Sequence, residues 1–330
     1  KSTVLQYIAW TLAHGLLVGD PELAVERLGL TLPSDREGQA RPSELKLPLP
    51  VLIPLYAYAE HLRRHGDGND AHKATLVAFI SEYFIRRQAL GLPDDFFEQL
   101  LVQGQSCLLL LDGLDEVPDE PTRVRVSRAV EDLVHAAPRN QVVVTSRPAA
   151  YSGQAVLGAR FRHLHLQPMT PQQVTRLVTR LYQAAIADEG ERSRETAALL
   201  KAIENLERLR ARLGADERFI TTPLLVRMIV IVHFSRRQLP EQRAELYREV
   251  VDVLLTASYH PDVNVAQALA EMGGALSQRR NLLGELAFQM HSQGQGTRFI
   301  EEAALRNALV DSLAPEAGEL RAAEMVDAFV

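Results

Sequence analysis

The spacing of apolar residues predicts alternating strands and helices in the first half of the chain. Residues 107 to 112, "CLLLLD", form a continuous apolar run that ends in an aspartate, which is typical of a strand inside a parallel sheet. Residues 141 to 147 predict a second strand, the alternating segment 162 to 167 a third, and residues 50 to 58 a buried strand bounded by prolines. Strands separated by helical segments indicate βαβ units and a parallel sheet.

Helical periodicity fills the intervals between these strands. It occurs over residues 4 to 16, 75 to 90 and 122 to 136. Gly15 and Gly19 are expected to end the first of these helices. Residues 31 to 50, which are rich in proline, glycine and charge, are expected to form a loop.

After residue 168 the pattern predicts helices almost without a break. Thr170, Pro171 and Gln173 form a capping box that starts one helix. Further helices are expected from a stripe of leucine and isoleucine ended by Gly214, and from four later segments. The stripe is Leu199, Ile203, Leu206 and Leu213, and the segments are 223 to 234, 243 to 255, "LLGELAFQM" and "EEAALRNALVDSL". An α/β half is therefore followed by a helical half.

Composition fits a globular protein of two or three domains. The chain has 330 residues, 46% of them hydrophobic and 24% charged, and no apolar stretch long enough to cross a bilayer. A net charge of −6 argues against a general nucleic-acid binder. The single cysteine, Cys107, excludes an intrachain disulfide, is expected to be an inert core thiol, and favours a reducing, cytoplasmic location.

The acids that follow the run 107 to 112 are the strongest chemical signal. Asp112 ends the predicted strand as in a Walker B motif, where the carboxylate holds Mg²⁺ through water at the carboxyl edge of a parallel sheet. Gly113 allows a close turn, and Asp115 and Glu116 are expected to face the γ-phosphate and its attacking water. A solvated acidic turn is the alternative, and the continuous apolar run directly before Asp112 disfavours it.

The first three residues extend this interpretation. Lys1, Ser2 and Thr3 precede the first predicted helix, as the last three residues of a P-loop, G-x-x-x-x-G-K-[ST], would. The glycines of that motif would lie ahead of Lys1, so we expect the chain to be a piece of a longer protein. Taken alone, the triplet fits a basic N-terminus with a helix cap better.

Arg147 ends the strand predicted at 141 to 147. It lies close to the acids in the predicted sheet, where a fixed positive charge can sense the γ-phosphate. The alternative is that it pairs with Asp115 or Glu116 as a structural bridge. The two roles are compatible, and we favour the sensor.

On these residues the chain resembles the NACHT branch of the STAND nucleoside triphosphatases, which includes animal NOD-like receptors and bacterial anti-phage sensors. The doubled acid after the Walker B strand is the most specific mark of the resemblance. It extends over nearly the whole chain, through "KST", "LPVLIPLYAYAEHL" (49 to 62), "LLLLDGLDEVPDE" (109 to 120), "VVVTSRPAAY" (142 to 151), "HLQPMTPQQV" (165 to 174), "TPLLVRMIVIVHF" (222 to 234) and "LPEQRAELYREVVDVLL" (239 to 255).

The resemblance implies a P-loop ATPase that binds ATP or ADP together with Mg²⁺. Lys1 would bind the β- and γ-phosphates, and Thr3 would touch the α-phosphate. Ser2 and Asp112 would hold Mg²⁺, Ser2 directly and Asp112 through water. Without the glycines, the given chain is expected to bind nucleotide poorly.

The resemblance also implies roles for four residues other than those that would bind the phosphates and Mg²⁺. Asp115 or Glu116 would position or activate the attacking water, and the sequence leaves open which of them does so. Arg147 would report the γ-phosphate. Pro223, in a helical subdomain, would pack against the adenine.

The implied organisation is that of a signalling switch. Residues 1 to 167 would form the P-loop domain without its first strand and glycines, residues 168 to 240 a helical subdomain, and residues 241 to 330 a truncated winged helix. ADP would hold these parts closed, and ATP would support a homo-oligomer in bacterial immunity or anti-phage defence. An effector domain before the chain and a trigger-sensing region after it are expected partners.

Two other functions compete with the switch. One is a transcription regulator whose winged helix binds DNA, although no recognition-helix pattern is apparent and DNA is not an expected partner. The other is a nucleotide-independent scaffold. The histidines in "HLRRH" (61 to 65) and "RFRHLHL" (160 to 166) lack a cysteine or acidic set at zinc spacing, so we expect them on solvated faces.

Overall fold

The computed structural model describes residues 1–30, 46–65, 71–87, 91–102, 104, 106–214, 218–236, 239–240, 242–255 and a few residues between 280 and 310. These residues fall into two compact units. The first lies within Lys1–Arg162 and the second begins at His163.

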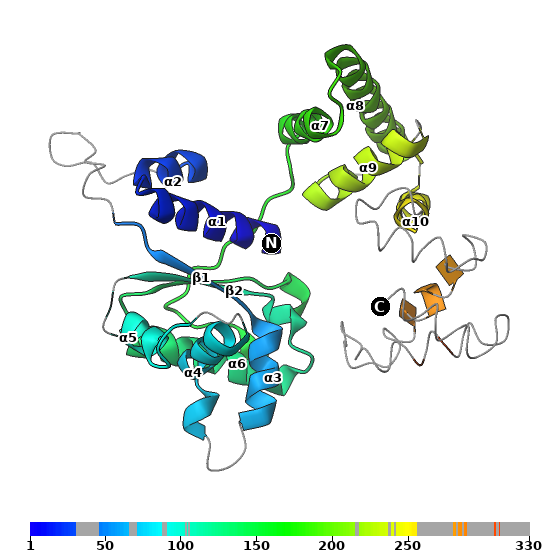
Figure 1. The fold of residues 1–330 in the computed structure, drawn as a ribbon. Coiled ribbons are helices and arrows are strands. Elements are labelled where there is room, and N and C mark those ends of the chain that lie inside the picture. Colours follow the sequence, from blue (N-terminus) through cyan, green and yellow to red (C-terminus); the bar gives the residue numbers. More distant parts are fainter. Residues whose placement is uncertain are drawn as a thin grey trace. The chain divides into compact units, whose positions relative to one another are not determined.

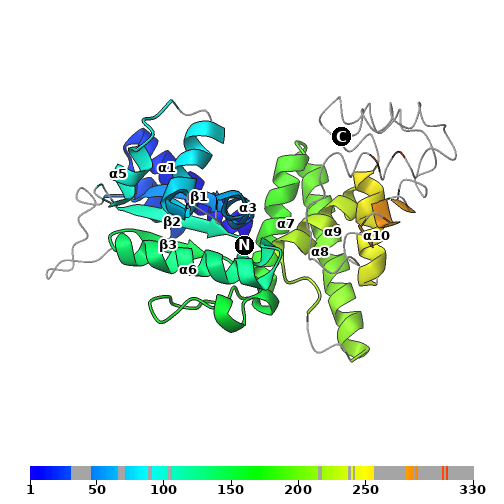
Figure 2. The ribbon, with the colours of Figure 1, turned by 90° about the horizontal axis from the view of Figure 1, so that it is seen from below.

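The first unit is built on a parallel sheet, as the sequence predicts. Among the described residues the sheet has three strands in the order β1 (Leu49–Pro54), β2 (Cys107–Asp112) and β3 (Gln141–Val144), which Figure 2 shows side by side. β2 is central and pairs parallel with both neighbours, so its backbone is bonded on both edges. This position explains why its apolar run is continuous.

Helices cover both faces of this sheet (Figure 1). α1 (Ser2–Val18) and α2 (Pro21–Leu28) lie on one face. The other face carries α3 (Leu55–His65), α4 (Leu76–Glu82) with a π-helical turn at Tyr83–Arg87, α5 (Phe96–Val102) and α6 (Glu120–Ala136). The two faces give the sheet the α/β architecture of a P-loop NTPase.

Successive side chains of β2 point to opposite faces, and this alternation divides the core. Cys107, Leu109 and Leu111 are fully buried in the main cluster with α3, α4, α5 and α6. Leu108 packs against the smaller cluster around Leu12 of α1. Burial raises the pKa of the Cys107 thiol, which agrees with the inert core thiol expected from the sequence.

The structure differs from the sequence prediction in several places. The strand predicted at 141 to 147 ends at Val144, so that Arg147 lies three residues beyond it. The apolar run 50 to 58 is a strand only to Pro54, because Leu55 starts α3 and its apolar side chains are buried as a helix. The segment 162 to 167 forms no strand, and Leu164 and Leu166 are 79% and 66% exposed. Gly15 lies buried inside α1, and only Gly19, with φ 68°, ends that helix.

The second unit is helical, with α7 (Pro171–Ala185), α8 (Glu189–Arg212), α9 (Pro223–Arg236) and α10 (Arg243–Leu254). The predicted capping box of Thr170 and Gln173 starts α7. α9 packs against α7 and α10, and its buried face includes Val226 and Ile229. Of the predicted stripe on α8, Leu213 falls outside the helix and is exposed. Of the helix expected at "LLGELAFQM", residues 283–285, 287 and 288 are described and are helical. The helix expected at "EEAALRNALVDSL" lies largely outside the described residues, as does most of the predicted winged helix.

Asn140 fixes the end of the sheet at which β2 and β3 begin. Its buried side-chain oxygen accepts a hydrogen bond from the Cys107 N–H at 3.0 Å. Its amide nitrogen donates to the carbonyl groups of Leu101 (2.8 Å) and Ala137 (3.1 Å). One side chain thus joins the start of β2 to the ends of α5 and α6.

Replacing Asn140 with alanine is expected to destabilise the first unit by about 1–3 kcal/mol, because buried backbone groups lose their partners. Trp10 is the only tryptophan, so its fluorescence during urea unfolding reports this unit. The neighbouring Arg139 is exposed, and Arg139→Ala should change the unfolding free energy by less than about 0.5 kcal/mol. Equal unfolding curves for the two variants would contradict the role given to Asn140.

Candidate functional site

The carboxyl ends of β2 and β3 are joined by the side chain of Thr145. The Thr145 hydroxyl donates a hydrogen bond to Asp112 Oδ1 at 2.6 Å and accepts one from the Gly113 N–H at 3.0 Å. Backbone bonds from Thr145 N to Leu111 O and from Leu114 N to Thr145 O continue the pairing. The Asp112 carboxylate is therefore held at the strand end, where the sequence predicts it.

The turn after Asp112 brings a second carboxylate back over the strand end. Gly113 has φ 78°, a left-handed conformation that residues with a side chain rarely adopt. A Cβ atom at Gly113 would lie 2.8 Å from the Glu116 carboxylate, so the absence of a side chain gives Glu116 its place. Glu116 lies in a short 3-10 turn, η4 (Leu114–Glu116).

Asp115 and Arg147 form a two-point contact across the ends of β2 and β3. Asp115 Oδ1 accepts from the Arg147 backbone N–H at 3.1 Å, and Asp115 Oδ2 lies 3.3 Å from Arg147 Nε. The Asp115 side chain is 5% exposed, whereas that of Arg147 is 67% exposed. The structural bridge considered for Arg147 is thus present, and it leaves most of the guanidinium accessible at the sheet edge.

The first residue of the chain lies at the same edge. The Lys1 ammonium group donates to the carbonyl oxygen of Ser146, which lies between Thr145 and Arg147. Ser2 and Thr3 are exposed in the first turn of α1. The structure therefore brings Lys1 close to the ends of β2 and β3, although 110 residues of sequence lie between Lys1 and Asp112.

Pro223 belongs to the second unit. It is the exposed first residue of α9, two residues before the buried Leu225. The helix that the sequence predicts to open at this proline is present. The proposed contact of Pro223 with adenine remains a prediction.

Sequence inspection missed Thr145 and Ser146 as parts of this site. Both are polar and directly follow the β-branched strand β3, and this position in the sequence could have indicated that they belong to the site. Their function depends on pairing with Asp112 and Lys1, which are remote in sequence, and so only the fold identifies it.

The remaining acids of the run serve the helix that follows. Asp119 is the N-cap of α6, and its carboxylate accepts hydrogen bonds from the backbone and hydroxyl of Thr122, both at 2.8 Å. Burial raises the pKa of Asp119, but these bonds lower it more, so that it lies below its usual range. Glu120 is exposed in the first turn of α6.

A parallel sheet with an aspartate at the end of its central strand, and an arginine three residues beyond the end of the next strand, indicates an α/β protein of the P-loop nucleoside triphosphatase type. The family model of the NACHT domain matches residues 56–185, which include Asp112, Asp115, Glu116 and Arg147. Residues 56–185 of this chain are therefore a NACHT domain, the nucleotide-binding P-loop NTPase module of that family. No curated protein and no solved structure was found to match it. Over the described residues, no helix is both long and apolar enough to span a bilayer.

Replacing Thr145 with valine removes the hydroxyl group at nearly constant volume. It is expected to lower the unfolding free energy of the first unit by about 1 kcal/mol, because Asp112 and the Gly113 N–H lose their shared partner. Urea unfolding followed by Trp10 fluorescence measures this. Thr145→Ser keeps the hydroxyl and should recover most of the loss, whereas equal losses in both variants would refute the bridging role.

Proposed function

We propose that this chain is the nucleotide-responsive part of a signalling switch that binds ATP or ADP with Mg²⁺ and hydrolyses ATP slowly. The observation that carries the proposal is the hydrogen-bonded edge formed by Asp112, Thr145, Asp115 and Arg147 within the segment that matches the NACHT domain. Phosphoryl transfer depends mainly on positioned charge, and this edge concentrates both signs of charge on rigid strand ends.

The Mg²⁺ ion would lie beside Asp112. A hard cation prefers carboxylate and hydroxyl oxygens, and the Thr145 hydroxyl already fixes the direction of the Asp112 carboxylate. Ser2 would supply a hydroxyl oxygen from the start of α1. Lys1 would neutralise the β- and γ-phosphates, and Thr3 would touch the α-phosphate, while Pro223 would close over the adenine.

The contacts favour different duties for the two later acids. Both oxygens of Asp115 accept or face nitrogen atoms of Arg147, so Asp115 would orient this arginine toward the γ-phosphate. The Glu116 carboxylate lies against Gly113 at the strand end, which suits the group that positions the attacking water. The sequence leaves open whether Asp115 or Glu116 positions the attacking water, and we propose Glu116 for this role.

Switching requires that the two nucleotides bind two conformations differently. Moving an equilibrium from 1:99 to 99:1 needs about 5.5 kcal/mol of differential binding. Arg147 is the residue through which the γ-phosphate would contribute to this difference. The same proposal includes domain boundaries at residues 167 and 240 and a homo-oligomer that forms with ATP. It also includes a cytoplasmic location and a role in bacterial immunity or anti-phage defence.

The first test compares two aspartates of the same acidic run. The assay uses this chain together with any residues that its gene encodes before Lys1. In that protein, Asp112→Asn is expected to lower Mg²⁺-dependent ATP turnover by about a hundredfold or more. Asp119→Asn is the matched control, since asparagine also caps a helix well, and it should keep turnover near the parent value. Measured phosphate release at equal protein concentration gives the ratio. Unchanged turnover in Asp112→Asn would contradict the role given to Asp112, and absence of nucleotide binding and turnover in the parent would support a nucleotide-independent scaffold instead.

The second test separates Glu116 from its neighbours. Glu116→Gln is expected to lower the hydrolysis rate by about a hundredfold while ATP and ADP affinities, measured with fluorescent analogues, stay within about threefold. Glu120→Gln removes an exposed charge four residues later and should leave both quantities unchanged. A normal hydrolysis rate in Glu116→Gln, with loss in Asp115→Asn, would reverse the assignment of the two acids.

A further inference from the structure

A cluster of two histidines and one glutamate lies on the helices of the first unit, away from the acids after β2. His61 and His65 are four residues apart on α3, and Glu82 is the last residue of α4. Each offers one ligand atom, and these atoms lie within 4.8 Å of one another. The sequence prediction of a solvated face is wrong for His61, which is 2% exposed. The missing acid comes from α4, which the spacing within "HLRRH" could not indicate.

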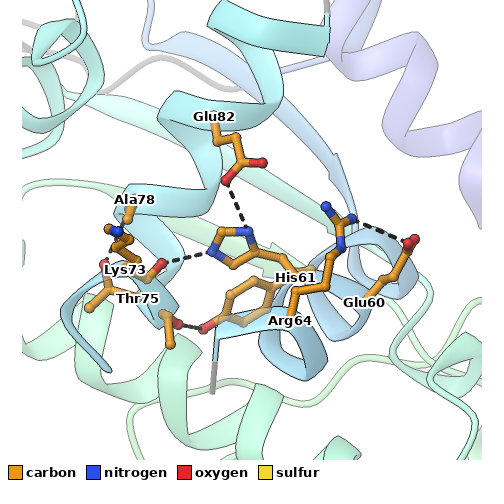
Figure 3. A network of polar contacts seen from close by, with 9 residues as sticks. Glu60, His61, Arg64, Lys73, Thr75, Ala78 and Glu82 are labelled. Atoms are coloured by element: carbon orange, nitrogen blue, oxygen red, sulfur yellow. Dashed lines mark hydrogen bonds and ion pairs between the residues drawn. The ribbon is translucent and has the colours of Figure 1, made fainter. Parts of the chain in front are cut away.

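The hydrogen bonds of His61 determine which ring nitrogen faces the glutamate. His61 Nε2 lies 2.7 Å from the carbonyl oxygen of Lys73, and a carbonyl can only accept, so Nε2 carries a hydrogen atom. Figure 3 shows the ring between Lys73 and Glu82. In the neutral imidazole, Nδ1 then presents a lone pair to Glu82 Oε2 at 3.2 Å. Two acceptors at this distance require a shared proton or a metal ion between them.

The geometry suits a metal ion. Ligand bonds of 2.0–2.1 Å in a tetrahedral arrangement place neighbouring ligand atoms about 3.3 Å apart, close to the separation of His61 Nδ1 and Glu82 Oε2. A metal-binding histidine commonly donates its other N–H to a backbone carbonyl, as His61 does to Lys73. Two imidazoles and one carboxylate favour Zn²⁺ over Mg²⁺, which prefers an all-oxygen shell.

Aromatic packing holds the buried ligand in place. The His61 ring lies 5.2 Å from the ring of Phe79 and 6.3 Å from that of Tyr58, measured between centroids. The Tyr58 hydroxyl donates to the Ala74 carbonyl at 2.9 Å, which ties α3 to the same short turn (Ala71–Ala74) that receives the His61 bond. His65 is half-buried with its ring centroid 4.6 Å from that of His61. A small rotation of the His65 side chain is the main adjustment that a metal would need.

The cluster opens on a cavity of about 1060 Å³, which His61, His65 and Glu82 all line. The cavity gives a cation access and leaves room for water at a fourth coordination position. Besides the three ligand residues, the wall carries three acidic and three basic side chains, which are Asp94, Glu98, Asp132, Lys73, Arg125 and Arg128. The basic charges around Glu82 are therefore balanced by an equal number of acidic charges.

We propose that His61, His65 and Glu82 bind one Zn²⁺ ion that joins α3 to α4, with a fourth position open to the cavity. The competing arrangement is a proton shared by His61 and Glu82 without a metal. Glu82 and His65 are the informative residues to change, because both are partly exposed and their amide replacements keep similar volumes.

Zn²⁺ alone, titrated against a chromophoric chelator, tests the site in the full chain. The parent is expected to bind one equivalent, and Glu82→Gln and His65→Gln are each expected to bind it at least tenfold more weakly. His135→Gln, an exposed histidine on α6, is the matched control and should bind as the parent does. Millimolar Mg²⁺ should not displace the ion, and Asp112→Asn should bind it normally, so the outcome is independent of the proposed ATPase site.

A local readout identifies where the ion binds, since the chain has ten histidines. Imidazole ¹⁵N NMR spectra should show coordination shifts at His61 Nδ1 and at one nitrogen of His65, and Co²⁺ should give the visible absorption bands of a four- or five-coordinate site. Circular dichroism of the metal-free variants must match that of the parent. Equal Zn²⁺ affinity in the parent, Glu82→Gln and His65→Gln, or shifts confined to other histidines, would overturn the proposal in favour of the shared proton.

Discussion

The hydrogen bond between the Thr145 hydroxyl and the Asp112 carboxylate is the interaction on which the candidate site depends. β3 has only four residues, Gln141–Val144, and its register with β2 places Leu111 opposite Val144. The backbone bonds of Thr145 to Leu111 and Leu114 extend this short pairing. The Thr145 side chain adds a bond at one end, and Asn140 adds one at the other through the Cys107 N–H. Side-chain bonds at both ends thus fix the strand that positions Ser146 and Arg147.

In this arrangement the enclosed acid of the site has a positively charged partner. The Asp115 side chain is almost fully enclosed, and it receives both a backbone N–H and a guanidinium group from Arg147. Removing an unpaired carboxylate from water is costly, so the pair lets an acid lie at 5% exposure in the turn. The guanidinium remains mostly in solvent, where an arriving anion can approach it. The same contact therefore stabilises the turn and presents a positive charge.

The sequence predicts those parts of the fold that local pattern determines. The continuous apolar run of β2 identifies a central strand because such a strand has no polar face, and the capping box at Thr170 identifies the start of α7. The sequence also indicates Asp112 at the end of β2, Asp115 and Glu116 in the turn that follows, and Arg147 shortly after β3. The sequence does not distinguish the strand in 49 to 54 from the helix that begins at Leu55, since a buried strand and a buried helix are both apolar on every side.

Features that depend on pairs remote in sequence could not be predicted in this way. The alternation in 162 to 167 resembles a strand, yet a strand also needs a partner edge, and Leu164 and Leu166 are exposed instead. Thr145 acquires its role from Asp112, 33 residues earlier, and Glu82 approaches His61 only because α4 packs near α3. In each case the local pattern shows the residue but not its partner.

The α3 helix connects the two parts of the first unit to which chemistry has been assigned. It begins at Leu55, directly after Pro54, which is the register partner of Asp112 in β1, and it contacts the η4 turn that carries Asp115 and Glu116. His61 lies six residues further on, about 9 Å along the helix axis, and so it cannot share a ligand shell with an ion held by Asp112. A cation at His61 and Glu82 would instead fix α3 against α4. Any effect on the acids would have to pass through the rigid body of α3, because a packed helix transmits a displacement of one end to the other.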